Sequence, residues 1–272
     1  MRLLNALLLS VLALPAAAMA QSLPSGSAHF ILYQGDKTVG VADRTVQPTG
    51  VGYTLTSQGK LSLSKFNYSF NQTQHVDKGL NLVSSQISAN VNGKPVTFGV
   101  RTDSTGREFQ LAIGAEGKNT QNTVDRHQHL VLLADLDPAA YTLLTQIVIQ
   151  KPQTSWVLIP KQEGLLVPTE ITPDPSVRGR LGGNQVDVQH ATVVVGEQNP
   201  VSVELFYGRD GDLLEADLPE QNFYVVRDGF KLIDRPKPNL PRGTAPSAQD
   251  QQGQQQGQYP QQQQAYPQPQ QQ

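Results

Sequence analysis

Cysteine is absent from this chain of 272 residues, and charge of either sign is scarce. The absence of cysteine excludes disulfide bonds, cysteine-ligated zinc, iron–sulfur centres and cysteine nucleophiles. The net charge is only -2, from 21 basic and 23 acidic residues, so the chain lacks the positive excess that a nucleic-acid backbone attracts. The sequence therefore predicts a fold held together by packing, with no nucleic-acid partner.

Long apolar runs are also missing, except at the N-terminus. Arg2 precedes an apolar run from Leu3 to Leu14, and Ala18-Met19-Ala20 forms a small-x-small cleavage site before Gln21. This pattern predicts a signal peptide over residues 1–20 and a mature protein that is periplasmic or secreted. No later segment has the roughly 20 apolar residues of a membrane helix, so we expect no membrane span.

The C-terminal segment has almost no apolar residues. From residue 236 onward proline and then glutamine dominate, and a Tyr-Pro-Gln motif occurs twice, at Tyr259 and at Tyr266. Such a composition cannot bury enough apolar surface to offset the entropy of ordering, so we predict a disordered tail over 236–272. The tail either is a solvated extension or contacts an envelope protein through its Tyr-Pro motifs.

Between residues 21 and 235 the dominant hydrophobic period is two, which is typical of β-strands. Alternating apolar residues run through 83–91 and resume at 96–100, on either side of Asn92-Gly93. Asn-Gly tolerates the positive φ angles of a type I′ turn, so this segment predicts a β-hairpin. Further alternating segments at 109–113, 186–194 and 201–207 predict an antiparallel meander.

One segment has a helical period instead. Asp137 is a candidate N-cap, Pro138 follows at the first helical position, and apolar residues then recur at helical spacing. The stripe consists of Ala140, Leu143, Leu144, Ile147 and Val148. We therefore predict a mainly β domain over 21–235, a curved antiparallel sheet or half-barrel wrapped around one central helix.

The order of these features resembles that of a known group of proteins. The features that carry this resemblance are the segment Thr38-Val39-Gly40-Val41, the strand 53–57, the Asn92-Gly93 hairpin, the helix from Asp137, the strand 156–160 and the hairpin 206–214. Over most of 28–234 this pattern is similar to uncharacterised exported bacterial β-proteins whose fold is like that of the lipoprotein carriers LolA and LolB. The resemblance implies an apolar cleft between sheet and helix and carries over no catalytic residue.

The sequence offers few candidates for catalysis. It contains no Gly-x-Ser-x-Gly elbow, no phosphate-binding loop of the right spacing and no dinucleotide fingerprint. His127 and His129 would share one face of a strand, a spacing that lets two imidazoles bind one metal. Two solvated histidines at a strand start are the simpler interpretation, because a metal site needs three or four ligands. We predict a protein that is not an enzyme and has no cofactor.

Three aromatic residues, Phe66, Tyr68 and Phe70, alternate with polar residues and would lie on one strand face. They are either ordinary core or the lining of an apolar cleft. A shift of the apolar phase just before them predicts a β-bulge near Ser64-Lys65.

These observations favour an exported, non-enzymatic envelope protein that binds an apolar small molecule or lipid between sheet and helix. The predicted ligand-binding residues are Phe66, Tyr68, Phe70, Leu143, Leu144 and Ile147. Two alternatives remain at this point: a metal-dependent enzyme that uses His127 and His129, and a structural envelope protein that acts through its glutamine-rich tail.

Overall fold

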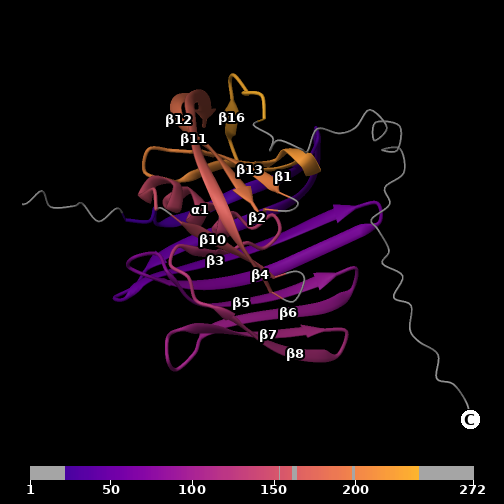
Figure 1. Cartoon of the computed structure of the whole chain (residues 1–272). Coiled ribbons are helices and arrows are strands. Elements are labelled where there is room, and N and C mark those ends of the chain that lie inside the picture. The colour runs from indigo at the N-terminus through magenta and orange to yellow at the C-terminus, as the bar shows by residue number, and fades with distance from the viewer. Residues whose placement is uncertain (1–21, 153, 161–163, 198–199, 239–272) are drawn as a thin grey trace, which may run out of the picture.

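The computed structural model describes residues 22–152, 154–160, 164–197 and 200–238, and all of the strands in these ranges belong to one sheet (Figure 1). The predicted signal peptide and the tail from residue 239 lie outside the described residues. The first half of the chain forms eight strands: β1 (Gly26–Gln34), β2 (Lys37–Pro48), β3 (Gly52–Leu63), β4 (Phe66–Asp77), β5 (Leu82–Val91), β6 (Lys94–Thr102), β7 (Glu108–Ala115) and β8 (Lys118–Asp125).

The second half of the described chain contains the helix and the other strands. These elements are β9 (Leu130–Leu132), α1 (Pro138–Gln150), β10 (Ser155–Ile159), β11 (Leu165–Leu181), β12 (Asn184–Val195), β13 (Val201–Tyr207), β14 (Leu213–Leu218), the short 3-10 helix η1 (Pro219–Gln221), β15 (Phe223–Arg227) and β16 (Phe230–Leu232).

Two meanders meet in the middle of the sheet. The strand order is β8-β7-β6-β5-β4-β3-β2-β1-β15-β14-β13-β12-β11-β10-β9, and β16 pairs with β11. Neighbouring strands are antiparallel, apart from β9 and β10, which are parallel. β8 and β9 follow each other in the chain and lie at opposite ends of this order, so the sheet is curved and unclosed.

Helix α1 begins where the sequence predicts. The Asp137 carboxylate accepts hydrogen bonds from the backbone N–H of Ala139 at 2.9 Å and of Ala140 at 3.3 Å, and Pro138 occupies the first turn. Its residues are buried from Pro138 to Val148, on every face. A helix buried all round must be enclosed by its neighbours, and the sheet supplies the enclosure.

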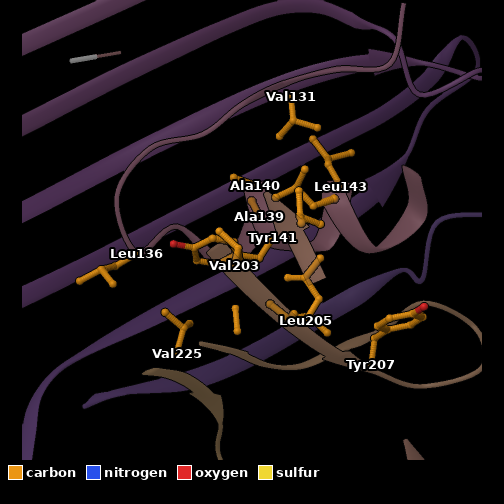
Figure 2. Packing of buried hydrophobic residues seen from close by; sticks show 14 of the residues in the cluster. Val131, Leu136, Ala139, Ala140, Tyr141, Leu143, Val203, Leu205, Tyr207 and Val225 are labelled. Atoms are coloured by element: carbon orange, nitrogen blue, oxygen red, sulfur yellow. The ribbon is translucent and has the colours of Figure 1, made fainter. Parts of the chain in front are cut away.

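The main core lies between α1 and the inner face of the sheet. Figure 2 shows Ala140, Tyr141 and Leu143 of α1 beside Val203 and Leu205 of β13. The predicted fold class, a mainly β protein with a curved antiparallel sheet around one helix, is confirmed.

A second cluster explains the continuous apolar run of β9. Leu130 and Leu132 pack with Phe98 and Leu111 of the β6–β7 region, whereas Val131 between them belongs to the core around α1. β9 is therefore buried on both faces, as continuous apolar strands usually are. No helix in the described ranges is long and apolar enough to cross a membrane.

The turns show where local sequence was informative. Asn92 and Gly93 have φ angles of 53° and 85°, so the predicted type I′ hairpin between β5 and β6 is present. The predicted bulge at Ser64-Lys65 is wrong. These two residues form the turn between β3 and β4, with Leu63 paired to Phe66, because an apolar phase shift can mark a tight turn as well as a bulge.

Candidate functional site

Two adjoining cavities in the described part of the chain are lined mainly by apolar side chains, and we call the smaller of them the apolar pocket. It has a volume of about 360 Å³, within the range of small-molecule sites. Its walls are the inner faces of β3 to β7, the segment 133–136 before α1, Pro160, and the corner between β14 and β15. The lining residues are Leu61, Leu63, Phe66, Tyr68, Ile87, Ala89, Val91, Val96, Phe98, Ile113, Leu133, Ala134, Asp135, Leu136, Pro160, Leu218, Gln221 and Phe223.

The pocket exists because the sheet continues past the helix. Strands β1 to β3 and β13 to β15 supply much of the core around α1, whereas β5 to β7 extend beyond it. The inner faces of β5 to β7 are partly covered by Leu130, Leu132 and Leu158 of β9 and β10. The pocket is the inner surface that these strands and the segment before α1 leave unfilled.

Aromatic side chains form one wall of the apolar pocket. The rings of Phe66 and Tyr68 are stacked at 6.2 Å, and those of Tyr68 and Phe70 at 5.5 Å. Burial raises the pKa of Tyr68, so its hydroxyl stays protonated far above physiological pH. The pocket therefore combines a broad apolar surface with a few polar groups at its margin, the usual composition of a ligand site.

Two of the six predicted ligand-binding residues line the apolar pocket, and the other four are buried in the core. Phe66 and Tyr68 line the apolar pocket. Phe70 is buried in the core next to Tyr68. The remaining three, Leu143, Leu144 and Ile147, are 2%, 1% and 1% exposed in the core, and they are absent from the lining of both the apolar pocket and the pocket beside it.

Sequence reasoning missed most of the lining. Ile87, Ala89 and Val91 of β5, with Val96 and Phe98 of β6, share one face of the predicted hairpin. Their alternation was visible, but it predicts only that this face is covered. The segment 133–136 gave no signal, because its position depends on how β9 folds back onto the sheet.

A second pocket adjoins the first. It has a volume of about 730 Å³ and lies between the segment 133–135, β10, β11 and the start of β13. Both pockets are lined by Leu133, Ala134, Asp135, Leu218 and Gln221. These shared residues form the partition between the two cavities, so a change in the position of this segment would alter both.

Two carboxyl groups lie in or next to this shared segment, those of Asp135 and Asp137. Asp137 is fully buried, and burial raises its pKa to about 6 although two backbone N–H groups bind it. This confirms the helix cap that the sequence predicts. Asp135 lines both pockets.

The histidine pair does not lie on a strand. His127 and His129 lie in the connection between β8 and β9, so the prediction that they share a strand face is wrong. The His127 ring stacks on Trp156 with 4.0 Å between centroids, and His129 has a left-handed φ of 53°. No group of three or more His, Asp or Glu suited to a metal ion occurs among the residues that the structure describes.

Comparisons with known proteins inform the fold of this chain and give no information about its site. No family model and no curated protein matches the sequence. The structure is similar to the crystal structure of a beta-barrel-like protein from Brucella abortus, described as a domain of unknown function, DUF1849. The TM-score is 0.54 at 10% identity, over 78% of this chain and 99% of that one. The chain thus has the fold of a beta-barrel-like bacterial protein, and the resemblance to LolA and LolB stays a prediction.

Proposed function

We propose that this chain is an exported, non-enzymatic protein of the bacterial cell envelope that binds an apolar or lipid-like molecule in the apolar pocket. The observation that carries the proposal is the pocket itself, a cavity of about 360 Å³ with apolar and aromatic walls beside a tightly packed core. Large apolar surfaces in soluble folds are normally filled by side chains, and those that are not filled commonly bind a ligand. The signal-peptide pattern supports the location.

The apolar pocket lies away from the apolar stripe of the helix, where the sequence predicts part of the ligand site. The ligand would lie against β3 to β7 and the segment 133–136, beyond the N-terminal end of α1. The apolar stripe of the helix is used for packing. Phe66, Tyr68, Phe98 and Phe223 would provide aromatic contacts, and the Tyr68 hydroxyl and Gln221 would contact a polar group of the ligand.

Filling the pocket should abolish binding without unfolding the protein. Ala89→Trp places a large ring in the cavity, so uptake of the apolar fluorescent probe N-phenyl-1-naphthylamine should fall at least about 10-fold, the equivalent of about 1.4 kcal/mol. The matched control is Ala112→Trp, because Ala112 is exposed and lines the polar groove on the outer face of β5 to β8 instead. Fluorescence titration of the three proteins measures the effect. Equal uptake by wild type and Ala89→Trp would locate binding elsewhere.

A further inference from the structure

The Tyr-Pro motifs of the C-terminal tail are not used by the function proposed above. Tyr259-Pro260 and Tyr266-Pro267 carry the only large apolar side chains between Gln249 and Gln272. The surrounding residues are mostly glutamine, which has no apolar surface comparable to an aromatic ring. Any contact that the tail makes with an apolar surface would therefore use these two tyrosines and their prolines.

The chain leaves the fold close to the apolar pocket. Arg235 forms ion pairs with Glu215 and Asp217, which are 1% and 5% exposed, and its guanidinium lies 5.1 Å from the centre of the Tyr224 ring. Asp217 and its neighbour Leu218 are on opposite faces of β14, and Leu218 lines the apolar pocket. Arg235 thus anchors the start of the tail on one face of β14, and the apolar pocket lies on the other face of the same strand.

The pocket fits a Tyr-Pro motif in chemistry and size. Its aromatic wall is the kind of surface that receives extended proline-containing segments in other domains. A volume of about 360 Å³ is sufficient for a side chain of this class. The polar groove on the outer face, lined by residues such as Gln86, Gln110 and Gln121, contains no Phe, Tyr or Trp, and His75 is its one ring.

The two motifs are covalently attached to the domain that carries the pocket, so even weak binding would fill the pocket for much of the time. A segment of about 20 residues can extend up to about 65 Å, so both motifs can reach a pocket adjacent to the anchor. Intramolecular binding through a short linker has an effective concentration in the millimolar range. A motif with only millimolar affinity would therefore occupy the pocket about half of the time.

We propose that Tyr259-Pro260 and Tyr266-Pro267 dock in the apolar pocket of their own chain and compete there with the apolar ligand. The competition rests on the function proposed above, whereas the docking does not. In this arrangement the two motifs and the apolar ligand exclude each other from the apolar pocket.

The test uses the full mature chain with both tyrosines replaced, Tyr259→Ser with Tyr266→Ser. The matched control carries Gln255→Ser with Gln263→Ser, which changes the same tail without removing an aromatic ring. Two-dimensional amide NMR should show shifts at Ala89, Val91 and Val96 in the tyrosine variant only. Gly99 and Ala112, which line the outer groove, should not shift. The tyrosine variant should also bind N-phenyl-1-naphthylamine about two- to fivefold more tightly than wild type.

Each outcome decides between the two proposals. Unchanged pocket resonances, or shifts confined to the outer groove, would overturn the docking. Shifts that disappear on tenfold dilution would show docking onto a second copy and would also overturn it. Pocket shifts without probe binding by any of the proteins would support the docking and reject the proposed ligand function. Pocket shifts with tighter probe binding support both.

Discussion

Replacing Asp212 with alanine is expected to lower the free energy of unfolding by about 3–5 kcal/mol. Asp212 accepts a hydrogen bond at 3.0 Å from Arg44, whose side chain is 2% exposed, and it is also paired with Arg227. Burial lowers the pKa of Arg44, and the Asp212 carboxylate opposes that shift. Without Asp212 the buried Arg44 guanidinium would lose the carboxylate that pairs with it directly, and only the weaker electrostatic effect of Asp210 would remain.

The same network connects the helix to the sheet. Arg44 of β2 donates to the Thr142 hydroxyl at 2.8 Å, and Thr145 donates to the Gly211 carbonyl at 2.7 Å. Loss of Asp212 should therefore loosen the contact between α1 and the turn before β14.

The matched control for Asp212 is an exposed ion pair in the same sheet. Asp187 and Arg209 are 3.0 Å apart with side chains 66% and 77% exposed, so Asp187→Ala should cost less than about 1 kcal/mol. Urea unfolding followed by circular dichroism measures both variants. Equal losses for Asp212→Ala and Asp187→Ala would mean that the Arg44 network does not hold the helix in place.

Leu144→Ala is expected to cost about 2–5 kcal/mol of unfolding free energy and to leave probe uptake unchanged. Leu144 is 1% exposed in the core around α1 and is not part of the lining of the apolar pocket. The substitution removes packed methyl groups and leaves a void that the surrounding strands can close only in part.

Ala89→Trp should show the opposite behaviour, with uptake lost and stability little changed. Val51→Ala serves as the control for stability, because Val51 is 82% exposed and its loss should cost less than about 0.5 kcal/mol. A Leu144→Ala protein that remains stable but no longer takes up the probe would place the ligand along the helix, as the sequence alone suggested.

Much of the fold could be predicted because its signals are local. The cap at Asp137, the proline after it and the spacing of Leu143, Leu144 and Ile147 predict the helix before any tertiary contact is known. The Asn92-Gly93 hairpin is equally local, since positive φ at two successive residues strongly restricts the sequence.

The site could be predicted only in part, because its position depends on contacts between segments that are far apart in the sequence. The alternation of side chains along a strand tells which residues share a face, and it correctly placed Phe66 and Tyr68 together. It does not tell whether that face is covered by a helix, by β9 or by nothing. The path of residues 126–136, which returns from the edge strand β8 to the inner face, decides where the cavity remains.

The measurement that tests the apolar pocket most directly is native mass spectrometry of the mature protein, released without detergent from the envelope of a bacterial host. We expect wild type and Ala112→Trp to carry a noncovalent apolar adduct that dissociates on mild activation. Ala89→Trp, with the pocket filled, should have the mass of the polypeptide alone. An identical bare mass for all three proteins, together with no uptake of the fluorescent probe by wild type, would contradict the proposed binding function.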